Sequence, residues 1–133
     1  MPVNNYCFIE EADRAMASGS TEEITYRNAV SRAYYGLYHC ALAHADTLLT
    51  PPLSACAGGS HRKVSDYYSI GLAKTREQTI KFRRVSIKLM QLHGLRVKAD
   101  YRLSEEVHEA DAISTIITSK SVFQDLIGLG AVA

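Results

Sequence analysis

Apolar residues recur at helical spacing through much of the chain, and the clearest stripe lies within residues 30–48. Its members stand one, three or four positions apart: Val30, Ala33, Tyr34, Leu37, Ala41, Ala45 and Leu48. Because an α-helix completes a turn in about 3.6 residues, this spacing gathers the apolar side chains on one face. The pattern predicts a long amphipathic helix with that face turned toward a core.

Capping residues and prolines indicate where this helix and a shorter one before it begin and end. A first helix is predicted over residues 5–17, where a Ser-Gly pair follows. Ser20 and Glu23 have the spacing of a capping box, which predicts the start of the long helix. Pro51-Pro52 predicts its end near Leu49, because the residue before a proline is disfavoured in a helix.

A loop and two further helices are predicted for the middle of the chain. Residues 51–60, PPLSACAGGS, form the loop, and Ser60 is predicted to cap a third helix that runs toward Lys74. A fourth helix is predicted from about Arg76 to Arg96. One face of that helix carries Phe82, Val85, Leu89 and Leu92.

The last part of the chain predicts one more helix. The segment KADYRLS, residues 98–104, is predicted to interrupt helical structure, and its Ser104 to cap the final helix. Gly128 and Gly130 are predicted to end that helix. Apolar residues fall at helical rather than alternating spacing, so no strand is expected. The sequence predicts an all-α fold, an antiparallel bundle of four to five helices in one domain over residues 1–133.

Composition narrows the class of protein. With 133 residues, 47% of them apolar, the chain has the size and core of one globular domain. Its three cysteines include no Cys-x-x-Cys pair and give no sign of a disulfide framework or a cysteine-ligated zinc site. The first residues do not resemble a signal peptide, and no run of about 18 apolar residues predicts a membrane span. We therefore expect a cytoplasmic protein with reduced thiols that does not enter a membrane.

Charge is unevenly distributed, although the formal net charge is only +1. Residues 74–102 hold nine basic and two acidic side chains, for a local charge of +7, while both ends of the chain are acidic. Such a segment can bind a phosphate backbone, with Arg83, Arg84 and Lys88 as candidate contacts. Alternatively, these cations only solvate the outer face of a long helix.

The long helix also has polar positions opposite its apolar stripe: Asn28, Arg32, Tyr35, His39 and Asp46. Arg32 and His39 lie two turns apart on one line, so they are a candidate pair for RNA cleavage or phosphate binding. The alternative is an ordinary solvated face or a dimer contact. The histidines of the chain show no metal-ligand spacing, and the tyrosines of the second and third helices either stack on bases or fill a core.

Two segments of the chain, in their order and spacing, resemble one known superfamily. RNAVSRAYYGLYHCALAHAD is followed by a basic helix and then by LHGLRVKADYRLSEEV. This arrangement resembles the HEPN superfamily, the higher-eukaryote and prokaryote nucleotide-binding helical domains. The nearest branch is a small prokaryotic one with a Tyr-Tyr helix, here Tyr34-Tyr35, and an Arg-x-x-Ala-Asp-Tyr motif, here Arg96 to Tyr101. The likeness spans nearly the whole chain.

The resemblance implies a helical bundle that often dimerises. Many HEPN proteins are paired with a minimal nucleotidyltransferase in toxin–antitoxin loci, and active members are metal-independent endoribonucleases. Their signature is an Arg, often followed by a polar residue, and then a His after four to six residues. Two such motifs meet across the dimer interface. Cleavage of RNA by its own 2′-OH needs an acid or base such as His and a phosphate-holding cation such as Arg, and no cofactor is expected.

Three stretches compete for that signature. Arg96 takes the arginine role by position, but Asp100 stands where His is expected, so the two residues can instead pair and pin the turn. Arg102 and His108, with five residues between them, fit the spacing, although the residue after the arginine is apolar. The arginine–histidine pair of the long helix, with six residues between its members, also fits but lies in a different helix.

The sequence supports two functional hypotheses. The first is a toxin-type protein that cleaves or binds RNA, with Arg102 and His108 as phosphate clamp and general acid/base. Arg96, Asp100 and Tyr101 then shape the site. The second is a non-catalytic HEPN module that binds nucleotide or RNA through the basic fourth helix, or docks a nucleotidyltransferase encoded beside it. Either protein is expected to be prokaryotic and to act as a homodimer.

Overall fold

The computed structural model describes residues 2–71 and 73–133, and this part of the chain consists of helices joined by loops. In chain order the elements are α1 (Tyr6–Ala17), α2 (Glu23–Leu48), the short 3₁₀ helix η1 (Leu53–Ala55), α3 (Ser60–Ile70), α4 (Arg76–Tyr101) and α5 (Glu109–Gly128). The described residues contain no strand, so the prediction of an all-α fold is confirmed.

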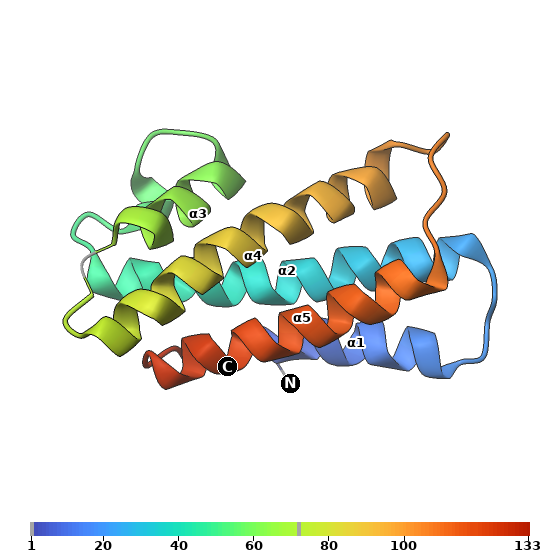
Figure 1. Cartoon of the computed structure of the whole chain (residues 1–133), viewed down its shortest axis with the longest axis horizontal. Helices are drawn as coiled ribbons and strands as arrows, with labels where there is room; N and C mark the ends of the chain where they lie inside the picture. Colours follow the sequence, from blue (N-terminus) through green and yellow to red (C-terminus); the bar gives the residue numbers. More distant parts are fainter. Residues whose placement is uncertain (1, 72) are drawn as a thin grey trace.

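The helices α1, α2, α4 and α5 lie side by side, and successive ones run in opposite directions, as in an antiparallel bundle (Figure 1). The central element is α2, because α1, α4 and α5 all pack against it. The short α3 lies against α4 at one end of the bundle. Close packing of α1 on α2 depends on Gly36, where a β-carbon would come within 2.8 Å of the Ile9 side chain.

The apolar stripe predicted for the long helix lies in the core. Six of its seven residues are buried: Val30, Ala33, Tyr34, Leu37, Ala41 and Ala45. The prediction is wrong for Leu48, which is 52% exposed because it is the last residue of α2 and lies at the rim of the bundle. The face predicted for the basic helix, which is α4, is buried as well. Helical spacing therefore identified the core of both long helices.

The predicted start of α2 is wrong. Glu22 is the N-cap, and Ser20 makes no cap to the helix. The Glu23 carboxylate accepts hydrogen bonds from Arg27 and, at 3.1 Å, from the backbone N–H of Val107 just before α5. A capping box needs that carboxylate for the local backbone, and here it is used by a distant segment of the chain. The third helix differs in a smaller way, since Gly59 rather than Ser60 is its N-cap.

The predicted interruption after Arg96 is also wrong, because α4 continues to Tyr101. The end of α4 is stabilised from α2 by the buried Arg27, which donates to the carbonyl oxygens of Lys98 and Ala99 at 3.0 and 2.9 Å. The same guanidinium bonds to carbonyls of the loop that follows. Carbonyls at a helix C-terminus lack partners within the helix, so a buried cation there stabilises the last turn.

The last helix begins later than predicted. Its N-cap is His108 rather than Ser104, and the Asp111 carboxylate accepts a hydrogen bond of 2.9 Å from the His108 backbone N–H. It ends at Gly128 as predicted, and Gly130 follows with φ of +102°. In the described residues we find no helix that combines the length and apolar character of a membrane span.

Candidate functional site

Aromatic and basic side chains gather where α2, α3 and α4 meet. Tyr34 and Tyr35 come from α2, His61 from the first turn of α3, and His93 and Arg96 from the second half of α4. All of these side chains are buried or half-buried. Three helices therefore contribute to one polar cluster beside the core.

The centre of this cluster is a pair of histidines. The ring centroids of His61 and His93 are 4.9 Å apart, and the rings are inclined by 32°. His61 Nδ1 lies 2.6 Å from the Tyr34 hydroxyl, at hydrogen-bond distance. The second ring nitrogen of His61 and both nitrogens of His93 have no hydrogen-bond partner among the described residues. The pair therefore has nitrogens free to accept or donate protons.

The two histidines line a cavity of about 400 Å³. We call this cavity the histidine pocket, and its other walls include Tyr34, Arg62, Asp66 and Met90. This volume lies toward the lower end of the range that is usual for small-molecule pockets. The pocket combines a cation, a carboxylate and an apolar side chain with the two imidazoles.

The pKa values of both histidines are lowered from their ordinary value. For His61 the main cause is burial, followed by the nearby His93 and the positive charge of Arg96. For His93 the causes are burial and then the charge of Arg96. Burial also raises the pKa of Tyr34 well above its usual value, so the phenol keeps its proton. Both imidazoles are therefore mainly neutral near neutral pH.

Arg96 is held in a fixed position beside the pair. Its Nε donates to Asp100 at 2.9 Å, and its NH2 group donates to the hydroxyls of Tyr35 and Tyr101. The guanidinium carbon lies 5.0 Å from the Tyr35 ring centroid and 5.1 Å from that of Tyr101, within the range of cation–π contacts. The predicted Arg96–Asp100 pair thus forms, but it spans one turn of α4 instead of pinning a turn between helices.

The structure places Arg102 and His108 at the two ends of the α4–α5 loop. Both side chains are exposed, and no hydrogen bond joins them in the described part of the chain. Arg102 lies 3.7 Å from the Glu105 carboxylate, and His108 Nδ1 lies 3.6 Å from that of Glu106. Each residue is thus close to an acidic neighbour in the loop.

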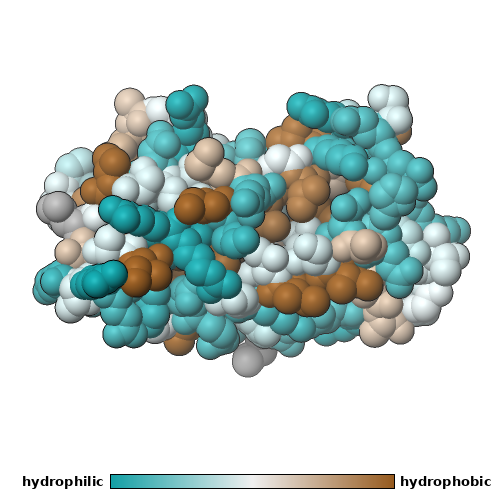
Figure 2. Space-filling view, viewed as in Figure 1, coloured by the Kyte–Doolittle hydropathy of each residue, from teal (hydrophilic) through white to brown (hydrophobic). Residues whose placement is uncertain are grey.

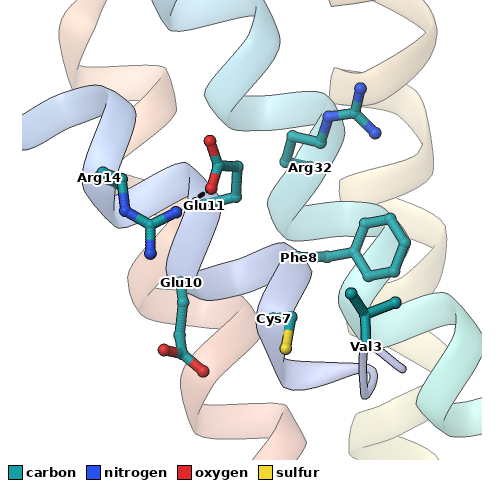
Figure 3. A pocket seen from close by; sticks show the side chains of 7 residues that line it. All are labelled: Val3, Cys7, Phe8, Glu10, Glu11, Arg14 and Arg32. Carbon is teal, nitrogen blue, oxygen red and sulfur yellow. Dashed lines mark hydrogen bonds and ion pairs between the residues drawn. The ribbon is translucent and has the colours of Figure 1, made fainter. Parts of the chain in front are cut away.

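Arg32 and His39 lie in different surroundings, although both are on α2. Arg32 is exposed and lines an open groove of about 470 Å³ between α1 and α2, where Figure 3 shows it near Phe8, with the Glu11–Arg14 ion pair on the α1 side. The ring of His39 instead stacks on Tyr35, with centroids 5.8 Å apart. Burial lowers the pKa of His39. The His39 ring also lies 5.6 Å from the ring of Phe8, between centroids, and no hydrogen bond among the described residues joins Arg32 to His39.

The three candidate phosphate contacts of α4 do not share one environment. Arg84 is engaged with α5, where it pairs with Asp125 and donates to Ser121 Oγ at 2.7 Å. Lys88 donates to Gln91 on its own helix at 3.3 Å, and Arg83 is exposed. The space-filling view shows polar side chains interleaved with apolar ones over α4 and α5 (Figure 2). The basic residues of α4 therefore have different surroundings: Arg84 contacts α5, Arg96 contacts Tyr35 of α2, and Arg83 is exposed.

Sequence reasoning missed the pairing of His61 with His93. These residues are far apart in the chain, and no local motif contains both. A signal was nevertheless present, because His61 shares helical phase with the buried Val64 and Tyr68, and His93 with the buried Leu89. Each histidine could be assigned to an inward face, but only the packing of α3 on α4 brings the faces together.

No group of three or more His, Cys, Asp or Glu side chains among the described residues is arranged to hold a metal ion. Comparison of the chain with protein-family models, with curated proteins and with solved structures finds no match. The HEPN resemblance therefore remains a prediction from the sequence motifs, and the function has to be argued from the site.

Proposed function

We propose that the chain is a HEPN-like, toxin-type endoribonuclease that needs no metal, with His61 and His93 as its catalytic acid and base. The observation that carries this proposal is the pair of imidazoles, with ring centroids 4.9 Å apart, that line one pocket beside a fixed arginine. Neither histidine belongs to a metal-holding group among the described residues, and neither caps a helix. Cleavage of RNA by its 2′-OH requires one group that accepts a proton and one group that donates a proton, and an imidazole can take either role.

The reaction assigns one proton transfer to each imidazole. The neutral ring takes the proton of the ribose 2′-OH, whose oxygen forms a bond to phosphorus. The protonated ring gives its proton to the 5′-oxygen as the bond from that oxygen to phosphorus breaks. The products are a 2′,3′-cyclic phosphate and a 5′-hydroxyl, and the two rings have exchanged protonation states. A hydrogen bond between His61 Nδ1 and Tyr34 leaves Nε2 as the reacting nitrogen of that ring.

Cations near the pocket stabilise the phosphate. Arg62 lines the pocket from α3 and is exposed, so it can move toward a bound phosphate. Arg96 is buried and held by Asp100 and two tyrosines, so it acts from a fixed position. Its charge favours a phosphate nearby and also favours the neutral form of both histidines.

The decisive experiment compares three histidine variants for cleavage of a mixed RNA pool in EDTA. His61→Gln and His93→Gln are each expected to lose on the order of 100-fold or more in rate, because each removes one proton-transfer group. His108→Ala is the matched control and is expected to retain the parent rate. Circular dichroism checks that all three variants are folded. Retained cleavage in both glutamine variants would contradict the proposal, and loss in His108→Ala alone would assign catalysis to Arg102 and His108.

A non-catalytic RNA-binding module is the second candidate, and the exposed Arg83 on α4 favours it. Under this alternative the parent protein binds RNA without turnover. Arg83→Glu is then expected to weaken filter binding of RNA, since it replaces a phosphate contact by a repulsive charge. Arg84→Glu is a poor test of RNA binding, because Arg84 also ties α4 to α5.

We also propose that the protein binds a protein partner and is located in the cytoplasm. Exposed apolar side chains on α4 and α5, among them Ile87, Ile113 and Ile117, are candidate contacts for a second copy of the chain or for a nucleotidyltransferase antitoxin. The three cysteines are free thiols, which is compatible with the cytoplasm that we propose as its location.

A further inference from the structure

The exposed rim of the histidine pocket has features that proton transfer does not use. Arg62 and Asp66 come from α3, and Met90 comes from α4. With a volume of about 400 Å³, the pocket has room for a small ring system as well as the reacting phosphate. The chemistry of this rim indicates what that ring system is.

Met90 supplies an apolar face. It is 62% exposed, so it does not contribute to the core of the bundle. It lies three residues before His93, which places both side chains on the same side of α4. A thioether and an imidazole are both suited to pack on a flat aromatic ring.

Asp66 supplies a carboxylate with free oxygens. Its side chain is 60% exposed, and its nearest cation is Arg62 Nε at 3.6 Å, beyond hydrogen-bond distance. No hydrogen bond among the described residues uses either carboxylate oxygen. The group can therefore accept two hydrogen bonds from one ligand at the pocket rim.

We infer that this rim is a nucleobase subsite in which Asp66 selects guanine. The Watson–Crick edge of guanine presents two parallel donors, N1–H and the N2 amino group, and a carboxylate accepts both. Adenine and cytosine present one donor beside an acceptor nitrogen that repels a carboxylate, and uracil presents one donor between two carbonyls. The inference rests on the proposed function, since it names the RNA residue next to the bond that the histidines cleave.

Binding of single nucleotides tests the subsite without requiring catalysis. Guanosine 3′-monophosphate is expected to bind the parent protein at least about fivefold more tightly than the adenosine, cytidine and uridine monophosphates, measured by calorimetry. Asp66→Asn is expected to abolish this preference. Glu77→Gln is a matched control, because Glu77 is an exposed carboxylate in a similar ion pair with Lys81 at 3.7 Å. Equal affinity for the four nucleotides, or a preference that persists in Asp66→Asn, would overturn the inference.

Cleavage of the four dinucleotides GpU, ApU, CpU and UpU separates this inference from the proposed function. Faster cleavage of GpU, lost in Asp66→Asn but not in Glu77→Gln, supports both. Cleavage without base preference overturns the guanine subsite and leaves the ribonuclease proposal standing. Selective guanosine 3′-monophosphate binding without cleavage of any dinucleotide supports the subsite and contradicts catalysis.

Discussion

Two tyrosine–histidine hydrogen bonds join α2 to α3, and they differ in how the second histidine nitrogen is used. In one, Tyr34 of α2 bonds to His61 of α3 at 2.6 Å. In the other the order is reversed, and His44 of α2 bonds to Tyr68 of α3 at 2.7 Å. The residue types and the helices are the same, so any difference in role must come from the surroundings.

The surroundings of His44 satisfy all of its polar atoms. Its Nε2–H donates to the Leu129 carbonyl after α5 at 3.2 Å, and its Nδ1 accepts from the Tyr68 hydroxyl, whose oxygen also lies 2.9 Å from the Ala41 carbonyl. His61 has no such second partner among the described residues and lines a pocket instead. A closed network stabilises the fold, whereas an open one retains a nitrogen for chemistry. Under the proposed function, the second hydrogen-bond partner, more than the first, separates the structural histidine His44 from the reactive histidine His61.

The largest effect on stability is expected from removing the closed histidine. His44→Ala should lower the free energy of unfolding by about 3 kcal/mol, because it leaves a cavity and an unpaired carbonyl on Leu129. His61→Ala should lower it by about 1 kcal/mol, the value of one hydrogen bond at a partly exposed site. Urea denaturation of both variants measures the difference. Equal losses would contradict the distinction between the two networks.

Removing only the tyrosine hydroxyls should give smaller changes. Tyr68→Phe is expected to cost about 1 to 2 kcal/mol, since His44 Nδ1 then lies buried without a partner. Tyr34→Phe should cost less than about 1 kcal/mol but should slow RNA cleavage, because His61 loses the bond that orients its ring. Thermal unfolding and a cleavage assay on the same samples would reveal whether the two effects separate. Slower cleavage in Tyr68→Phe alone would reverse the assignment.

The smallest effect is expected from pH, and its sign differs between stability and activity. Burial lowers the pKa of His44, His61 and His93 below 6.5, so these histidines stay neutral in the folded state when the unfolded chain begins to protonate. Their contribution to stability is complete above pH 6.5 and is lost as the pH falls toward the lowered values. Cleavage should instead rise as the pH falls toward 6.5, because one imidazole must be protonated. A rate that rises steadily with pH above 6.5 would contradict a histidine acid.

The sequence predicted the helices and several of their ends well, but it misplaced the start of α2, the end of α4 and the start of α5. Periodic burial of apolar residues is a local property, and six residues of the predicted stripe are buried: Val30, Ala33, Tyr34, Leu37, Ala41 and Ala45. Helix ends depended on distant partners instead. Glu23 bonds to Val107, and Arg27 supports the end of α4, so neither the predicted cap nor the predicted break occurs. Local rules fail where a long-range hydrogen bond replaces the local one.

The candidate site likewise contains one pair of residues that the sequence could predict and one pair that it could not. The pairing of Arg96 with Asp100 could be predicted, because residues four apart on a helix are neighbours. The meeting of His61 with His93 could not, because it depends on how α3 packs on α4. The motif that the HEPN resemblance favours therefore led to Arg102 and His108, while tertiary structure brings together a different pair.

The hydrogen bonds of Arg27 also have a consequence for local unfolding of the molecule. This side chain of α2 holds the carbonyls of Lys98 and Ala99, and its neighbour Glu23 holds the amide of Val107. The first turn of α2, the last turn of α4 and the entry to α5 should therefore behave as one cooperative unit in native-state hydrogen exchange. The Val107 amide, although it belongs to a surface connection, should exchange at the rate of that whole unit and more slowly than the fraying ends of the chain.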